Sequence, residues 1–422
     1  MRTNVYAATL DTPTGMSRRI SRRRAFKSVL AGCAVATSGC LRLQASGEGT
    51  TDANPETTDA SGTDDPASTD QSTTRSETTT TDDVLREDWT VSRWGSEAIP
   101  YEDTFYVSTW VSKQIYALRP DGEELWRTDE QTGKFKQHSL AVDDDVVVGC
   151  GYDGKVVALD RASGDVRWEF SDGEYATWSA QPLVTDRYVV GANAEEGVSF
   201  DETRYVVYVL DRQSGEVVTE FAYGEDAREQ DEPFVFNGVR SVDLLGDRLL
   251  VNCHNYVELY DASSLEEVGR LAKFGYGNSG MAYDGDWLSI SASGYVRRYE
   301  LTDSESNSVW AESTRGSVQR GPVVDGDSVY AAGEAGVFSF SLDSGDPEWE
   351  GRTEARVLKD PAVTTDHVWV VDEFEQLYGF RREDGEQVVK RTLPADSEVL
   401  SLRAIDDRLL VAMDPLTVYE VG

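Results

Sequence analysis

The stretch Val156–Trp168, VVALDRASGDVRW, decides the fold because the chain repeats its pattern. Two short segments rich in β-branched residues, Val156–Leu159 and Val166–Phe170, flank a turn that contains Asp160 and Gly164. Copies of one pattern at a steady spacing indicate a single supersecondary unit repeated along the chain. Variants of the stretch lie at Tyr116–Trp126, Tyr208–Thr219, Phe338–Trp349 and Tyr378–Val389.

Eight turns that contain an aspartate mark the period of the repeat. Six of the intervals between them span 39–42 residues, and one spans 61 residues. Each unit contains four short apolar segments and no helical period. The sequence therefore predicts an all-β fold, an eight-bladed β-propeller of four-stranded antiparallel blades. The marking residues are Asp103, Asp144, Asp186, Asp247, Asp286, Asp327, Asp366 and Asp407.

The two ends of the repeat predict how the ring closes. The eighth unit stops after Leu416–Val421, one strand short, whereas Asp88–Trp94 is left over before the first unit. We expect Asp88–Trp94 to supply the missing outer strand, which removes two sheet edges. The polar insertions Ala194–Arg204 and Gly224–Asp231 explain the long interval. They are either functional loops or solvent-exposed loops without a function. Strands of the second unit are predicted at Ser139–Val142, Val146–Gly151, Val156–Leu159 and Val166–Phe170.

The N-terminal segment has the features of an export signal. Arg22 and Arg23 belong to an arginine cluster, and the apolar run Val29–Gly39 is too short to span a bilayer. Small residues lead into Cys40. The segment resembles the twin-arginine (Tat) signal and lipobox of exported lipoproteins. That resemblance implies a lipid on Cys40 and a chain anchored to the outer face of the cytoplasmic membrane.

The domain boundaries follow from composition. Residues 1–39 are predicted to be the signal peptide, and either Met1 or Met16 is its start. Residues 40–84 are rich in Ser, Thr, Asp and Glu, and they bury too little apolar area to offset the entropy of ordering. We therefore expect a disordered linker there, and the propeller at residues 85–422.

Charge limits the partners of the protein. The chain has 40 basic and 77 acidic residues, a formal net charge of −37 and a pI near 4.3. An evenly negative field argues against binding nucleic acid or anionic lipid. It fits either a surface adapted to the high salt of a halophilic organism or an acidic face for a basic partner. The clusters Asp143–Asp145 and Glu225–Asp231 are candidate Ca²⁺ ligands, but neither has the spacing of an EF-hand loop.

Few residues are available for catalysis or metal binding. Cys150 and Cys253 are expected to be free thiols, because a disulfide between them needs Cα atoms within about 7 Å. No Ser–His–Asp arrangement emerges from the sequence. The histidines occupy different positions in their units, which argues against a zinc centre. They are His138, His254 and His367.

A family resemblance rests on the repeated stretch. Its residues Ala158, Asp160, Gly164 and Trp168 match the pattern A-x-D-x3-G-x3-W. The pattern resembles the tryptophan-docking motif of pyrroloquinoline-quinone (PQQ)-type β-propellers, and the resemblance covers Asp88–Gly422. It implies that the glycine supplies a turn position with positive φ and that the tryptophan packs between blades. Other motif residues are Trp126, Trp310, Gly345 and Trp349.

Several copies of the motif are incomplete. Thr219 and Val389 replace the tryptophan in the third and seventh units. Leu265 stands where the fourth unit needs glycine, which predicts a broken turn. Periodic tryptophans favour packing over the alternative, a platform for a ligand.

The resemblance implies two alternative functions. One branch of the family is non-catalytic, typified by the lipoprotein of the outer-membrane β-barrel assembly machinery. The other branch consists of quinone-dependent dehydrogenases, which bind PQQ and Ca²⁺ at the ring centre. The chain has no adjacent cysteines and no Cys-x-x-Cys-His motif. We therefore expect a monomeric scaffold without a cofactor, whose loops bind a protein or a small ligand; recognition of a surface glycan is a third class.

Overall fold

The structure is a computed structural model of the chain, which divides into the units Met1–Glu77 and Thr78–Gly422. All of the described residues lie in the second unit. They are residues 84–91, 95–129, 132–135, 139–171, 176–178, 180–195, 204–223, 239–253, 256–271, 278–284, 287–292, 294–301, 306–318, 321–334, 336–394 and 398–422.

The described residues form strands and no helical element, so the all-β prediction is confirmed. Their strands make eight antiparallel sheets, which we number along the chain. Sheet 1 contains β2 (Gly95–Tyr101), β3 (Thr104–Thr109), β4 (Ile115–Leu118) and β5 (Glu124–Arg127). Sheet 2 contains β6 (Leu140–Val142), β7 (Val146–Cys150), β8 (Lys155–Asp160) and β9 (Val166–Ser171). Sheet 3 contains β10 (Ala176–Trp178), β11 (Leu183–Val184), β12 (Tyr188–Glu195), β13 (Arg204–Asp211) and β14 (Val217–Tyr223).

The next sheets follow the same plan. Sheet 4 contains β15 (Val239–Leu245), β16 (Arg248–Cys253), β17 (Val257–Asp261) and β18 (Glu267–Leu271). Sheet 5 contains β19 (Asn278–Asp284), β20 (Trp287–Ala292), β21 (Tyr295–Leu301) and β22 (Ser306–Ser313). Sheet 6 contains β23 (Val323–Asp325), β24 (Ser328–Gly333), β25 (Gly336–Ser341) and β26 (Pro347–Gly351).

The last sheet combines the two ends of the described chain. Sheet 7 contains β27 (Ala362–Val363), β28 (His367–Val371), β29 (Gln376–Arg381) and β30 (Gln387–Thr392). Sheet 8 contains β31 (Ser401–Ile405), β32 (Arg408–Ala412), β33 (Leu416–Val421) and, as its fourth strand, β1 (Leu85–Val91). β1 pairs with β33 from Leu85 opposite Val421 to Val91 opposite Leu416.

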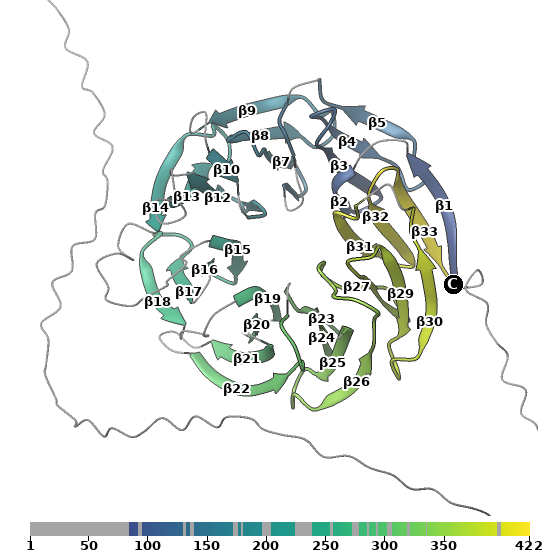
Figure 1. The fold of residues 1–422 in the computed structure, drawn as a ribbon. Coiled ribbons are helices and arrows are strands. Elements are labelled where there is room, and N and C mark those ends of the chain that lie inside the picture. Colours follow the sequence, from purple (N-terminus) through teal and green to yellow (C-terminus); the bar gives the residue numbers. More distant parts are fainter. Residues whose placement is uncertain are drawn as a thin grey trace, which may run out of the picture. The chain divides into compact units, whose positions relative to one another are not determined.

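Within each sheet, the strands run from an inner first strand to an outer fourth strand (Figure 1). The second and third strands read as continuous apolar runs because both of their faces are buried, as in β7 and β8. The outer strand β9 buries Trp168 and half-buries Phe170, and it exposes its other residues. The cores lie between consecutive sheets: Val148 and Ala158 of sheet 2 pack with Val189 and Tyr208 of sheet 3.

Sheet 3 departs from the predicted four strands. Its inner position is divided between β10 and β11, which pair with different parts of β12. Pro182 lies between them and has no N–H to donate to a strand ladder. The insertion Ala194–Arg204 begins and ends within the ladder of β12 and β13, while Gly224–Asp231 lies outside the described residues.

Successive antiparallel strands place the connections at two ends of the sheets. We call one the turn end, where the first strand turns into the second and the third into the fourth. We call the other the link end, where the second strand turns into the third and each sheet is linked to the next. The repeated Asp160 turn, between β8 and β9, belongs to the turn end.

Candidate functional site

Asp160 caps the turn between β8 and β9. Its Oδ1 accepts a hydrogen bond from the backbone N–H of Ser163 at 3.0 Å, and Arg167 donates to its Oδ2 at 2.8 Å. The guanidinium of Arg167 and then the N–H of Ser163 lower the pKa of Asp160. Asp211 and Asp261 accept the same kind of backbone hydrogen bond in their own turns. These carboxylates therefore stabilise turns.

Trp168 extends from β9 onto the turn of the next sheet. Its Nε1 donates to the carbonyl of Arg212 at 2.7 Å, and its ring covers Gly215. Ala158, opposite Trp168 in the register, is fully buried. We call this arrangement the inter-sheet tryptophan contact. It recurs in the pairs Trp89–Gly122, Trp126–Gly164, Trp310–Gly345 and Trp349–Gly385.

Two of the junctions without the tryptophan also lack the glycine that the indole would cover. Leu265 adopts a φ of +58°, and its N–H donates to a carbonyl of the same turn. The prediction that Leu265 breaks this turn is therefore wrong. Thr219 leaves room at this junction, and Leu265 packs into the core shared by sheets 3 and 4. After Val389, the next sheet has a chain end instead of a turn, where the N–H of Gly422 donates to Val84.

A glycine substitution tests the inter-sheet contact. A methyl group on Gly215 would lie 2.6 Å from the Trp168 ring, and φ is +71° there. We expect Gly215→Ala to lower the free energy of unfolding by about 2–3 kcal/mol, combining overpacking with left-handed strain. Gly246→Ala is the matched control, because its φ is +59° and nothing lies within 4 Å. Equal losses in urea unfolding would contradict the contact.

Arginines in the same turns reach back to the preceding sheet. Arg212 of sheet 3 contacts Asp143 at 2.5 Å and Asp145 at 3.2 Å, both in sheet 2. Arg161 of sheet 2 contacts Glu102 of sheet 1 at 2.8 Å. Nothing in the sequence indicates these ion pairs, because each arginine contacts a carboxylate of the preceding sheet. The cluster Asp143–Asp145, a candidate Ca²⁺ site by sequence, is thus engaged by a guanidinium.

The larger of two described pockets, about 1070 Å³, opens at the turn end of sheets 2–4. Arg212, Asp186 and Asp247 are among its lining residues. At its edge, Tyr101 donates to Asp144 at 2.5 Å, and this hydrogen bond raises the pKa of Tyr101 to about 12. Among the residues that the structure describes, no three His, Cys, Asp or Glu side chains are grouped to hold a metal ion.

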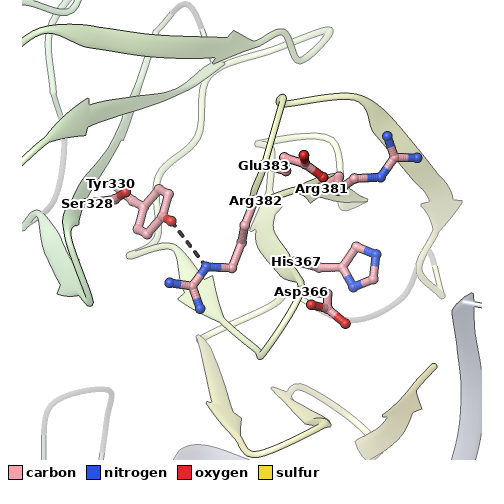
Figure 2. Close-up of a pocket in the computed structure, with 7 residues that line it drawn as sticks. All are labelled: Ser328, Tyr330, Asp366, His367, Arg381, Arg382 and Glu383. Atoms are coloured by element: carbon pink, nitrogen blue, oxygen red, sulfur yellow. Dashed lines mark hydrogen bonds between the residues drawn. The ribbon is translucent and has the colours of Figure 1, made fainter.

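The smaller pocket, about 500 Å³, lies between sheets 6 and 7 (Figure 2). Arg382 extends toward Tyr330, donates to its hydroxyl at 3.2 Å, and contacts Asp325 at 3.1 Å. His367 is buried beside them, and burial lowers its pKa. The hydroxyl of Ser328, which also lines this pocket, donates to Glu348 at 2.9 Å. The pocket is therefore lined by a third arginine that bridges two sheets.

Sheet 4 contains a buried polar network. The Glu258 side chain is 2% exposed, and it accepts hydrogen bonds from Tyr260, at 2.6 Å, and from Arg270. Tyr260 also shares a hydrogen bond with Tyr223 at 2.9 Å. Arg270 lies over the Tyr256 ring, 4.1 Å from its centroid. The network satisfies a carboxylate that would otherwise be costly to bury.

Cys150 and Cys253 are buried free cysteines, and burial raises the pKa of both thiols. The reactive species is the thiolate, so both should resist alkylation. We expect peptide mapping after iodoacetamide at pH 8 to show modification of neither residue in the folded protein and of both after denaturation. Rapid native labelling of either cysteine would contradict the burial.

Other sequence-predicted residues lie outside the described ranges, so their environments stay predictions. Within those ranges, no helix has the length and apolar character needed to cross a bilayer. The undescribed residues are Arg22, Arg23, Cys40, His138, His254 and Glu225–Asp231.

Comparisons with known proteins agree with this architecture. The family model for outer membrane protein assembly factor BamB matches residues 68–312 and 292–417. The crystal structure of BamB from Moraxella catarrhalis superposes with a TM-score of 0.63 and 16% identity, covering 80% of this chain and 98% of that one. The computationally designed Ika8 protein gives 0.62 and 12%, with coverages of 79% and 98%. No curated protein matches the sequence. The fold is a β-propeller.

Proposed function

Because the chain belongs to the family of the outer membrane protein assembly factor BamB, we propose that it is a protein-binding scaffold without catalysis. The observation that carries this proposal is that arginines at the turn end form ion pairs between neighbouring sheets. Arg212 and Arg382 project into the two pockets, and both bind carboxylates of the preceding sheet. These two arginines thus join neighbouring sheets. A rigid frame with loops that do not repeat suits recognition of another protein.

The proposed frame is a closed, eight-bladed ring, with β1 as the outer strand of its last blade. The pairing of β1 with β33 supports this, and so does Trp89 of β1, whose Nε1 donates to Pro120 of sheet 1 at 2.6 Å. The inner strands β2 and β31 are also in contact. Closure joins sheet 8 to sheet 1 and leaves neither as the end of a stack.

Photocrosslinking from both ends of the sheets tests the scaffold function. A benzophenone amino acid is placed at Val111 or Phe374 at the link end, and at Gln213 or Ser263 at the turn end. We expect ultraviolet irradiation of native membranes to give discrete protein adducts from at least one end. The scaffold proposal is wrong if none of the four positions gives an adduct. It is also wrong if the same adducts form when the protein is unfolded before irradiation.

The rival function is a PQQ-dependent dehydrogenase with its site at the ring centre. Glu97 of the inner strand β2 is fully buried and accepts a hydrogen bond from Arg403 of the inner strand β31 at 3.0 Å. Asp360 lies 3.9 Å from the same guanidinium. These carboxylates face an arginine, which does not fit a Ca²⁺ site. Saturable PQQ absorbance with Ca²⁺, together with oxidation of an alcohol or aldose, would overturn the scaffold proposal.

We also propose that a lipid on Cys40 anchors the protein to the outer face of the cytoplasmic membrane in a high-salt medium. The arginine cluster and small residues before Cys40 support this. Cys40→Ser should move the protein from the membrane to the soluble fraction after ultracentrifugation, while Cys33→Ser should leave it attached. Membrane retention of Cys40→Ser would exclude anchoring at that residue.

A further inference from the structure

Lysine is scarce in this chain and unevenly placed. The sequence has eight lysines, and four of them fall between residues 113 and 155. Three of these four, Lys113, Lys134 and Lys155, are described. Lys113 and Lys134 lie in connections at the link end of sheets 1 and 2, and Lys155 is the first residue of β8 at the same end. In a chain with a net charge of −37, such a concentration makes this part of the surface electrostatically distinct.

The clustered lysines differ from two other described lysines in their contacts. Lys359 lies 3.8 Å from Glu398, and Lys390 forms an ion pair with Glu354. Within the described ranges, Lys113, Lys134 and Lys155 form no ion pair. Their positive charges are therefore available to a partner.

Backbone hydrogen bonds bring together the three segments that carry these lysines. The N–H of Gly133 donates to the carbonyl of Lys113 at 3.4 Å, and the N–H of Tyr152 donates to the carbonyl of Lys134 at 2.6 Å. The N–H of Gly151 donates to the carbonyl of Lys155 at 2.7 Å. The three lysines thus belong to one continuous surface that spans two sheets.

Aromatic and apolar side chains belong to the same surface. Trp110 and Tyr152 meet edge to face, with ring centroids 5.6 Å apart. Val111 is 64% exposed and Tyr152 is 37% exposed. Two carboxylates, Asp129 and Asp153, also lie in these connections. We call Trp110, Val111, Lys113, Lys134, Tyr152 and Lys155 the lysine–aromatic surface.

This composition favours one kind of partner. Ammonium groups that are exposed, as at Lys134, or partly exposed, as at Lys113 and Lys155, attract carboxylates. The half-buried Trp110 and the exposed Tyr152 and Val111 offer area to an apolar or aromatic side chain. A flat anionic bilayer or a long nucleic-acid duplex would also face the acidic residues of this chain around the surface, which would repel it. A short acidic segment is small enough to contact only the segments that carry these lysines.

We propose that the lysine–aromatic surface binds an acidic protein segment that carries at least one aromatic side chain. The proposal rests on the protein-binding function given above and adds the location and the chemistry of the partner. The ammonium groups pair with carboxylates of the segment, while Trp110 and Val111 contact its aromatic ring. Ordinary ion pairs of this exposed kind are individually weak, so binding needs several of them together with the apolar contact.

Fluorescence anisotropy with a labelled 14-residue Glu/Asp peptide containing two phenylalanines tests the proposal. The full chain is measured at the lowest KCl concentration that preserves its circular dichroism. K113Q/K134Q/K155Q should weaken binding at least tenfold, and Trp110→Ala at least threefold. K273Q/K359Q/K390Q removes the same charge elsewhere and should change affinity less than twofold. Lys134→Glu is a second variant, at an exposed position, if the triple variant does not fold.

Several outcomes would overturn the proposal. The two triple variants could weaken peptide binding equally, or Lys134→Glu could leave it unchanged. The protein could bind a peptide with Gln in place of its acidic residues with equal affinity. Phosphatidylglycerol vesicles or duplex DNA could displace the labelled peptide at a lower concentration than the unlabelled peptide does. Failure here is separable from failure of the scaffold function. Protein adducts from Gln213, Ser263 or Phe374 without peptide binding would preserve the scaffold and exclude this surface.

Discussion

Trp168→Ala is expected to lower the free energy of unfolding by about 3–5 kcal/mol, the range found when a buried tryptophan is truncated in a packed core. Its side chain is 7% exposed and fills the junction between sheets 2 and 3, where it also donates to Arg212. Both the apolar contact and the hydrogen bond are lost in the variant. Urea unfolding followed by far-UV circular dichroism measures the change.

A second substitution separates the junction from the rest of the core. If the indole of Trp168 is what crowds Gly215, then Gly215→Ala should cost less in the Trp168→Ala background, about as much as Gly246→Ala. Val166→Ala, at an exposed position on the same strand, should change stability by under about 0.5 kcal/mol. Additive losses for the first pair would show that the two residues do not interact.

Arg270→Met is expected to cost about 3–5 kcal/mol, because it leaves the Glu258 carboxylate buried without its cation. Methionine keeps an apolar stem over the Tyr256 ring, so the loss of charge is the main change. Thermal and urea unfolding at neutral pH measure the effect.

The matched variant for this prediction replaces the carboxylate. Glu258→Gln in the Arg270→Met background removes the buried charge and should recover much of the lost stability. Arg356→Met is the control, since Arg356 pairs with Glu373 at an exposed site and its loss should cost under about 1 kcal/mol. Similar losses for Arg270→Met and Arg356→Met would refute the role assigned to burial.

Much of the β-architecture could be predicted from periodicity. The four strands expected around Val156–Trp168 lie within one residue of β6, β7, β8 and β9 at each boundary, because short apolar runs between aspartate turns leave little freedom. The register of sheet 3 was less accessible, since Pro182 divides its inner strand.

The side-chain contacts between sheets were only partly accessible from sequence. Trp89 precedes the first unit and follows no motif, so its contact with Gly122 requires the spatial position of β1. Leu265 was wrongly expected to break its turn, because the missing indole of the preceding sheet lies 46 residues away in sequence at Thr219. Whether two side chains fit together across a junction between sheets cannot be read from the sequence around either residue alone.

The candidate binding surface illustrates the same limit. Lys113 and Lys134 lie in two separate connections and Lys155 begins β8, and backbone hydrogen bonds between these segments bring them together. Charge counting showed an acidic chain, which concealed a local excess of lysine. Arg161 and Arg382 were missed for a related reason, since each acts on a residue of the preceding sheet.

The pairing of β1 with β33 also has a consequence for how the molecule reaches its folded state. Arg86 and Glu420, which pair across these strands, are 334 residues apart in sequence. Closing so long a loop is entropically unfavourable, and contacts of such high sequence separation slow folding. During synthesis, β1 leaves the ribosome long before its partner exists. The first of the described strands is thus among the last to find its place, and its edge stays open to other chains until β33 has been synthesised.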